Sequence, residues 1–262
     1  ESNTIGKFLC DEYYQSPLVT DKDNFLLFIE KLTFDVYLPW LDEEHLLFAS
    51  ELNISFNHKI LTSPSESIII SVDKAKTYLF AKNHLINVAE RTEKVPAFVR
   101  MNFSRGSKGA RKVTSQNELD NLDKNKYIVQ NLIEGVEYTI DCLCDMNGIP
   151  RVIVPRERVS AANVSLIGKV CMDNEIINFC EAILEKIKFF GPINIQVMKS
   201  ENKLFLIEIN PRLAGTSILT INSGADVLVD GIELFLGNDD RTSKYEVKDG
   251  LMMYRFYDEF YS

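Results

Sequence analysis

The sequence has few of the residues that build zinc sites or disulfide frameworks. Its three histidines, His45, His58 and His84, show no metal-ligand spacing, so we expect each at the surface or at a helix end. The five cysteines are odd in number and contain no C-x-x-C pair. Cys142 and Cys144 alternate along a predicted strand, where they share a face but are badly placed to bond to each other. We therefore expect reduced cysteines and a cytoplasmic location.

Long apolar runs and an excess of basic residues are also absent. The longest apolar runs, such as residues 67–72, are far too short to span a bilayer, so we expect no membrane association. The formal charge of -9 argues against a general nucleic-acid binder, although a local basic pocket can still hold an anionic nucleotide. No leader segment, internal repeat or low-complexity tract is visible, and because the chain begins at Glu1, we expect an N-terminal piece to be missing.

With 262 residues, of which 45% are hydrophobic and 26% charged, the chain is typical of globular proteins and has room for two or more packed lobes. Residues 23–32 have the spacing of an amphipathic helix, and residues 42–52 predict a helix with an acidic first turn. Residues 34–40 predict a short strand, and residues 59–64 and 67–72 add strand-like material. This alternation predicts part of an open parallel sheet.

The rest of the chain predicts two hairpins among further helices and strands. Asp73 can cap a helix over residues 74–85, and residues 96–113 predict a hairpin around a loop rich in Gly, Ser, Lys and Arg. Residues 115–118 form a capping box that opens another helix. The other predicted elements are strands at 126–133, 136–145 and 151–159, a helix at 174–189, a hairpin at 193–210, a helix around 224–237 and a closing strand at 250–257.

The second hairpin carries polar side chains where a hydrophobic strand ends, in the stretch "LFLIEINPR" at residues 204–212. Side chains alternate along a strand, so we expect Glu208 and Asn210 to share one face while Ile207 and Ile209 face the core.

A tight hairpin connection places Gln196 opposite Glu208. Together with Asn210 these residues gather a carboxylate and two amide oxygens, hard donors that suit Mg²⁺ shared with nucleotide phosphates better than zinc. Arg212 can approach the same phosphates through its guanidinium fork. The alternative is a polar strand end that turns into solvent.

The loop at residues 104–110 is a candidate phosphate cover. Its two glycines let backbone N–H groups come close to an anion, while Arg105, Ser107 and Lys108 add donors and charge. The loop joins two strands, unlike the G-x-x-x-x-G-K-[ST] phosphate loop, and can fold over a triphosphate as a flap. The alternative is a plain surface turn. Arg100, a cation in an apolar β arm just before the loop, requires an anionic partner.

Residues 129–141 are compatible with a nucleoside site. A strand carrying Leu132 and Ile133 can present backbone groups to an adenine edge, and Glu137 can accept from ribose hydroxyls. This signal is weak alone, because strand–turn–strand segments with a glutamate are common. Residues 155–159 place two arginines near the same region, for which the simplest interpretation is a solvated basic strand end.

Five stretches of this sequence resemble, in order, motifs of the ATP-grasp superfamily, in the branch of proteins similar to the large subunit of carbamoyl-phosphate synthase. They are "VRMNFSRGSKGARKV", "VQNLIEGVEYTIDCLCD", "PRERV", "GPINIQVM" and "LFLIEINPRLAG". The resemblance runs from about Asp73 to the "YRFY" strand, and it is specific because the motifs recur in order. The segment before it resembles the end of the Rossmann-like domain that precedes ATP-grasp cores.

The resemblance implies an α/β fold built on an α+β ATP-grasp core. A partial Rossmann-like N-terminal domain is expected over residues 1–72, a lid subdomain over 73–130, and a C-terminal antiparallel-sheet subdomain with the Mg-ATP site over 131–262. The metal ligands that it implies are Gln196, Glu208 and Asn210, and the catalytic residues are Arg212 and Arg100. The nucleotide-binding residues that it implies are Lys74, Arg100, Gly106, Ser107, Lys108, Gly109, Gln130, Leu132, Ile133 and Glu137.

The implied reaction is ATP-dependent joining of a carboxylate to an amine or another nucleophile through an acyl phosphate. ATP and Mg²⁺ are the implied cofactors, with Mn²⁺ as a substitute metal. The implied partners are small-molecule carboxylate and amine substrates and a second copy of the chain in a homodimer, with neither nucleic acid nor membrane. An ATP-grasp kinase or other phosphotransferase, and a non-catalytic nucleotide-binding module, are the alternatives.

The sequence departs from the family pattern at several positions. Met101 follows Arg100 where the family usually has Pro, and Gln130 and Asn131 replace acidic hinge residues. The connection between the helix at 74–85 and the first hairpin is short. The "GG" often found after the arginine strand is replaced by "SAANVS", which affects contacts with the acceptor and not the nucleotide site.

Overall fold

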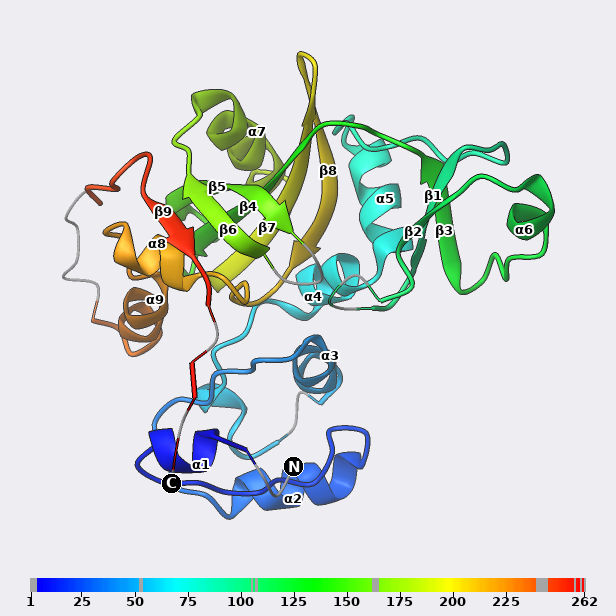
Figure 1. Cartoon of the computed structure of the whole chain (residues 1–262). Helices are drawn as coiled ribbons and strands as arrows, with labels where there is room; N and C mark the ends of the chain where they lie inside the picture. Colours follow the sequence, from blue (N-terminus) through cyan, green and yellow to red (C-terminus); the bar gives the residue numbers. More distant parts are fainter. Residues whose placement is uncertain are drawn as a thin grey trace.

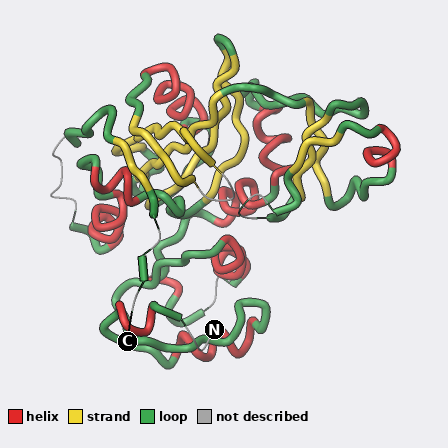
Figure 2. The backbone as a smooth tube through the Cα atoms, viewed as in Figure 1, coloured by secondary structure: helices red, strands yellow, loops and turns green. Residues whose placement is uncertain are grey.

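The protein contains two antiparallel sheets with helices packed against them (Figures 1 and 2). The strand orders are β2-β1-β3 and β8-β7-β4-β5-β6-β9. This arrangement agrees with the predicted α+β core. The computed structural model describes residues 4–51, 54–104, 106, 108–161, 165–238, 245–256, 258, 259 and 261.

The N-terminal segment, residues 4–61, is rich in helices and has a small core of its own. The predicted strands at 34–40 and 59–64, and the open parallel sheet expected from them, are wrong. The only β-structure in the described part of this segment is a single parallel β-bridge between Tyr37 and Ile60. The core consists of Phe25, Ile29, Leu47, Phe48, Phe56 and Ile60. The helical elements are α1 (Gly6–Leu9), α2 (Lys22–Glu30), α3 (Asp42–Ser50) and the short 3₁₀ helix η1 (Asn57–Lys59).

Residues 67–72, predicted as strand-like, lie in helix α4 (Ser65–Val72). A short apolar run does not distinguish a strand from a helix by its composition. Ser67, Ile68 and Ser71 are buried whereas Ile69 is exposed, which is the pattern of one helical face. The buried positions are therefore those of a helix that packs one of its sides against the rest of the protein.

The linker that follows the N-terminal segment attaches this segment to the start of β7 (Gly191–Ser200). Ser63 Oγ lies 3.0 Å from both the carbonyl oxygen and the amide nitrogen of Phe190, and Ser67 Oγ donates to the Lys188 carbonyl. Leu61 packs against Gly191, where a Cβ would lie only 2.4 Å from Leu61 Cδ2. These contacts hold α3 beneath the two sheets, as Figure 1 shows.

The small sheet confirms the predicted first hairpin. Asp73 accepts hydrogen bonds from the first turn of α5, as expected for a cap. Of the capping box predicted at residues 115–118, the Ser115 half is formed, since its side chain accepts from Glu118 N, whereas the Glu118 carboxylate accepts from Arg111. Ala97, Val99, Val113 and Leu119 form the core of this part. Its elements are α5 (Lys74–Asn83), β1 (Ala97–Met101), β2 (Arg111–Val113), α6 (Gln116–Asp120) and β3 (Tyr127–Asn131).

The large sheet is covered by helices on both faces, but incompletely on one. Helices α5 and α7 bury one face in the main core. Helices α8 and α9 cover only part of the other face, which leaves room there for polar side chains. The elements are β4 (Val136–Cys144), β5 (Pro150–Ala161), β6 (Ser165–Val170), α7 (Asn174–Leu184), β7, β8 (Lys203–Asn210), α8 (Ile218–Asn222), α9 (Val227–Phe235) and β9 (Met252–Tyr254).

The short connection between α5 and β1 joins the two sheets. The Asn87 carbonyl accepts from Leu206 N at 2.8 Å, at the edge of the large sheet. A few residues later the Glu90 carbonyl accepts from Asn131 N at 2.8 Å, at the edge of the small sheet. The connection therefore fixes the spacing of the sheets on either side of the space between them.

All five cysteines are free, as expected from their spacing. Burial raises the pKa of Cys144 to about 12 and raises that of Cys142 well above its ordinary value, so both thiols stay protonated near neutral pH. Among the described residues, no helix combines the length and apolarity that crossing a membrane requires.

His45 is buried in α3, so the expectation that it lies at the surface or at a helix end is wrong. Its side chain is 2% exposed, and its Nδ1 lies 2.8 Å from Thr62 Oγ1. Burial lowers the pKa of His45 to about 4; the charge of Asp42 opposes this shift and that of Arg212 adds to it.

We expect the free energy of unfolding to fall as the pH is lowered from about 6.5 to about 4, the unfolded and folded pKa values of His45. In this window the unfolded state binds more protons, so a contribution on the order of 3 kcal/mol, fully present above the window, is lost toward its lower end. Urea unfolding near both ends of the window should show a smaller pH effect in His45→Gln than in the parent. Equal pH effects in the two proteins would contradict this assignment.

Candidate functional site

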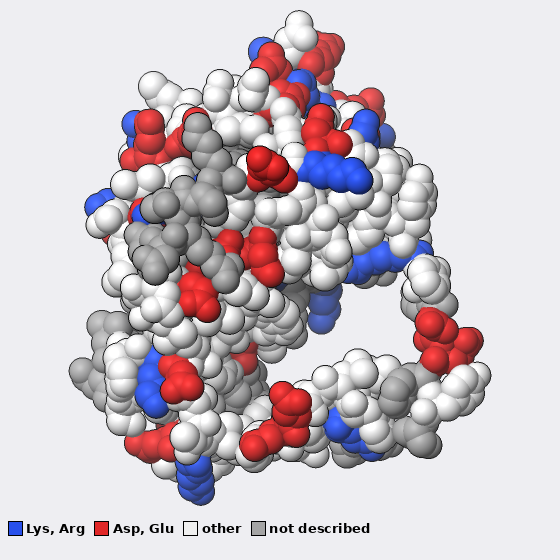
Figure 3. All heavy atoms as spheres, turned by 90° about the vertical axis from the view of Figure 1, so that its left-hand side faces the viewer, with Lys and Arg blue, Asp and Glu red and all other residues white. Residues whose placement is uncertain are grey.

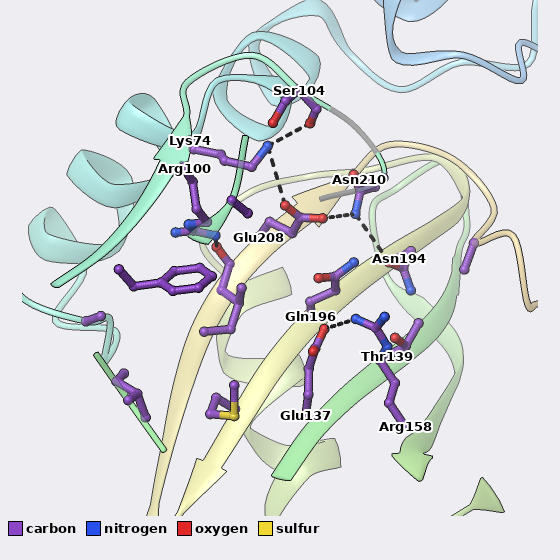
Figure 4. A pocket seen from close by; sticks show the side chains of 18 of the residues that line it. Lys74, Arg100, Ser104, Glu137, Thr139, Arg158, Asn194, Gln196, Glu208 and Asn210 are labelled. Atoms are coloured by element: carbon purple, nitrogen blue, oxygen red, sulfur yellow. Dashed lines mark hydrogen bonds and ion pairs between the residues drawn. The ribbon is translucent and has the colours of Figure 1, made fainter. Parts of the chain in front are cut away.

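The two sheets enclose a cavity of about 380 Å³, a size suited to a small-molecule ligand (Figure 4). Strands β1 and β3 of the small sheet form one wall, and β4, β5, β7 and β8 of the large sheet form the other. Of the residues predicted from the sequence, those that line the cavity are Lys74, Arg100, Gly106, Gln130, Leu132, Ile133, Glu137, Gln196, Glu208, Asn210 and Arg212.

Polar residues form rows across the large sheet because of its strand register. Glu208 pairs with Gln196, as predicted, Gln196 with Thr139, and Thr139 with Arg156. Directly paired residues share a face, so this row runs over four neighbouring strands. A second row joins Asn210, Asn194 and Asp141.

A β-bulge at Ile207 re-aims the end of β8. Val197 pairs with Leu206 and Gln196 pairs with Glu208, which leaves Ile207 as the extra residue. The expectation that Ile207 faces the core is therefore wrong: it lines the cavity, while Leu206 and Ile209 are buried in the core. The bulge presents both the Glu208 carboxylate and the Ile207 side chain to the ligand space.

The predicted metal ligands lie side by side on this face (Figure 4). Glu208 Oε1 accepts from Asn210 Nδ2 at 3.2 Å, and Asn210 Nδ2 also lies 3.3 Å from Asn194 Oδ1. Gln196 has no hydrogen bond from its side chain to any residue that the structure describes. The set offers one carboxylate and amide oxygens, and no cluster of three His, Cys, Asp or Glu side chains occurs among the described residues. These donors fit Mg²⁺ that shares its coordination with phosphates, and they do not fit zinc.

Lys74, the first residue of α5, reaches from the small-sheet side toward Glu208. Its Nζ donates to the Ser104 carbonyl at 2.8 Å and lies 3.5 Å from Glu208 Oε2. The side chain is 8% exposed. Lys74 thus links the loop after β1 to the carboxylate of the candidate metal site.

Arg100 is buried in β1, but its hydrogen-bond partners are neutral, not the anion expected. It donates to the Ile207 carbonyl at 2.8 Å and to Gln130 Oε1 at 2.6 Å. Burial lowers the pKa of Arg100, while the charges of Glu208 and Glu137 raise it. A buried cation with neutral partners favours an anionic ligand in the adjoining cavity.

The residues predicted to face adenine and ribose, Leu132, Ile133 and Glu137, also line the cavity. Leu132 and Ile133 lie in the linker between β3 and β4, and Gln130 is fixed by donating from Nε2 to the Ala89 carbonyl at 2.7 Å. Glu137 accepts from Arg158, as Figure 4 shows.

Among the described residues of the predicted phosphate loop, some line the cavity and others do not. Gly106 lines it, whereas Lys108 is exposed and, like Gly109, is not among the lining residues. Ser107 and Arg105 lie outside the described residues.

Several cavity residues were missed in the sequence, among them Thr139, Asn194 and Thr216, and Arg158 was placed near this region but given no role. For Thr139 a signal was available, because polar Glu137, Thr139 and Asp141 alternate with apolar residues in "EYTID". Thr216 follows β8 in an irregular stretch, where no periodicity points to it.

The interpretation of residues 155–159 as a solvated basic strand end is wrong. Arg156 is 3% exposed, and it donates to Thr216 Oγ1 at 2.6 Å and forms an ion pair with Asp141 at 2.9 Å. Asp141 also accepts from Thr220 Oγ1 at 2.6 Å. This buried network continues the polar face of the large sheet from the cavity toward α8.

The cavity differs in charge from the chain as a whole. Its described lining carries four cations, Lys74, Arg100, Arg158 and Arg212, against two carboxylates, Glu137 and Glu208. The chain carries a net charge of -9, and acidic side chains are spread over the face in Figure 3. A local excess of positive charge suits an anionic ligand such as a nucleotide.

The two sheets and the cavity between them define a protein of the ATP-grasp fold class. The biotin carboxylase domain of Hydrogenobacter thermophilus 2-oxoglutarate carboxylase matches with a TM-score of 0.70 and 14% identity, over 88% of this chain and 60% of that one. Carboxyaminoimidazole ribonucleotide synthase from Aspergillus clavatus matches with a TM-score of 0.69 and 14% identity, over 85% of this chain and 65% of that one. At these identities the likeness concerns the fold alone.

Residues 123–256, just over half of the chain, match the family described as "ATP-grasp in the biosynthetic pathway with Ter operon", and the chain belongs to this family. It is 23% identical to the carbamoyl phosphate synthase large chain of Thermoplasma acidophilum, over 80% of this chain and 24% of that protein. The corresponding protein of a Thermoanaerobacter species is 27% identical over 68% of this chain and 20% of its own length. The chain thus spans a quarter or less of these curated relatives.

Proposed function

We propose that this protein is an ATP-dependent ligase that joins a carboxylate to an amine, or to another nucleophile, through an acyl phosphate. The observation that carries the proposal is the meeting of Lys74, Arg100 and Arg212 with the Gln196, Glu208 and Asn210 set around one cavity. We also propose the three-part division of the chain at residues 72 and 130, with the nucleotide held between the second and third parts.

In this proposal the chain binds ATP along the cavity. Leu132 and Ile133 face adenine, Glu137 binds ribose, and the loop at Gly106 to Gly109, with Ser107 and Lys108, covers the phosphates. Gln130 orients Arg100, from which it accepts a hydrogen bond of 2.6 Å. Gln196, Glu208 and Asn210 would hold Mg²⁺, which would offset the charge of the phosphates.

The chemical steps need positioned charge more than a protein nucleophile. A carboxylate oxygen attacks the γ-phosphorus, the bond to the β,γ-bridging oxygen breaks, and ADP leaves. The amine then attacks the acyl carbon, loses a proton and expels phosphate. Lys74, Arg100 and Arg212 stabilise the developing charge, and closure of residues 97–113 excludes water from the acyl phosphate.

The relatives support this reaction class. The Hydrogenobacter domain is described as a dimer in complex with MgADP and bicarbonate, and the Aspergillus synthase as complexed with ATP. By the same likeness we propose a homodimer, with small-molecule carboxylate and amine substrates and Mn²⁺ as a substitute metal.

The test is a screen of carboxylates and amines with ATP and Mg²⁺, followed by ADP release and by mass spectrometry of the products. A ligase should turn over repeatedly, with release of ADP and phosphate, only when both substrates are present, and should form a product of the condensed mass. A stable phosphorylated product formed without an amine would instead show a phosphotransferase. Binding of Mg-ATP without turnover in any mixture would favour a nucleotide-binding module.

A further inference from the structure

The N-terminal segment reaches the candidate site through one ion pair. Arg212 Nε lies 2.7 Å from Asp42 Oδ1, and Arg212 Nη2 lies 3.1 Å from Asp42 Oδ2. The two side chains are 13% and 18% exposed, for Asp42 and Arg212 respectively. A two-point pair shielded to this degree fixes geometry far better than an exposed surface pair does.

Asp42 is itself held firmly. It begins α3, where Glu44 accepts from the backbone nitrogens of Trp40 at 2.6 Å and Leu41 at 2.9 Å and from Tyr37 Oη at 2.8 Å. His45, behind it in the same helix, has its pKa lowered to about 4 by burial and is neutral at pH 7. These contacts therefore fix the helix end that carries Asp42, and Arg212 is the cationic partner of its carboxylate.

The guanidinium of Arg212 keeps one edge free. A guanidinium has five N–H groups. Asp42 accepts one from Nε and one from Nη2, and the Leu213 carbonyl accepts one from Nη1 at 3.1 Å. One N–H on each Nη atom thus remains, and no residue that the structure describes accepts from either. Arg212 lines the cavity and Asp42 does not, so these two N–H groups are available to a ligand there.

We propose that Asp42 is a positioning residue, which holds Arg212 side-on so that its end-on fork receives the terminal phosphate of ATP. This inference rests on the proposed function. It makes the N-terminal segment part of the nucleotide site, although Asp42 acts only through Arg212. The anchoring of Ser63, Ser67 and Leu61 near the start of β7 keeps the segment at the right distance.

The test is calorimetric titration of the full chain with Mg-ATP and with Mg-ADP. In Asp42→Asn, which removes the charge at nearly constant volume, we expect the Kd for Mg-ATP to rise about tenfold and that for Mg-ADP less than about twofold. The unequal effect arises because the fork faces only the γ-phosphate, which ATP has and ADP lacks. Loss of folding stability alone would not change the preference of the folded protein for ATP over ADP.

Two controls sharpen this test. Asp35→Asn makes the same charge change at an exposed residue of the N-terminal segment and should leave both affinities unchanged. In an Arg212→Gln background, adding Asp42→Asn should cause no further change, because the residue it positions is gone. If Asp42→Asn cannot be purified, Asp42→Glu, which displaces the carboxylate by one methylene, should weaken Mg-ATP about threefold and leave Mg-ADP unchanged.

Unchanged Mg-ATP affinity in the Asp42 variant would overturn the inference. Tighter binding would also overturn it, since Asp42 would then compete with the ligand for Arg212. A parent that binds Mg-ATP but joins no carboxylate to an amine would contradict the ligase and leave the binding test decisive. A parent protein that does not bind Mg-ATP would overturn both the proposed ligase function and the positioning role of Asp42.

Discussion

Replacing Glu208 by alanine is expected to abolish the magnesium-dependent part of ATP affinity and to lower turnover on the order of a hundred- to a thousandfold. Glu208 is the single carboxylate of the candidate metal site, next to Asn210 and 3.5 Å from Lys74. Its removal deletes the one charged ligand but leaves the surrounding cations in place. ATP without magnesium should therefore bind as tightly as before, or more tightly.

The measurement compares ATP affinity in magnesium and in EDTA, together with ADP release in any active substrate mixture. Glu201→Ala, at the exposed turn of the same hairpin, removes the same charge far from the cavity and serves as the matched control. Magnesium-dependent binding and turnover that survive Glu208→Ala unchanged would show that the metal assignment is wrong.

Asp141→Ala is expected to cause the largest loss of stability, about 3–5 kcal/mol in the free energy of unfolding. Asp141 is 0% exposed and is the ionic partner of Arg156, which is itself 3% exposed. The variant leaves the Arg156 charge buried without an anion, and it also removes the acceptor of Thr220.

Urea unfolding followed by far-ultraviolet circular dichroism measures this loss. Replacing both partners with apolar residues, as in Asp141→Leu with Arg156→Met, should be less destabilising than Asp141→Ala alone, because no unpaired charge remains. Glu118→Ala, which breaks the exposed pair with Arg111, should cost less than about 1 kcal/mol. A cost for Asp141→Ala as small as that of Glu118→Ala would contradict the role of the buried network.

The sequence predicted well those features that depend on neighbouring residues. The caps at Asp73 and Ser115, the first hairpin, and the pairing of Gln196 with Glu208 all follow from short-range rules of capping and alternation. The order of motifs likewise identified the ATP-grasp family.

The predictions that were wrong depended on contacts between distant segments. The bulge at Ile207 shifts one residue of a regular alternation, and nothing in the local pattern marks its place. The run at 67–72 became a helix, and His45 and Arg156 became buried, because other elements cover them.

By itself, then, the sequence determined the hairpins, the helix caps and the residue types of the cavity, since these arise from interactions within a few positions of the chain. The tertiary structure decided which of those residues meet. Asp42 reaches Arg212 across 170 positions only because the N-terminal segment is docked beside β7. Packing of distant segments has no local periodicity, so this part of the site could not be predicted from the pattern of residues.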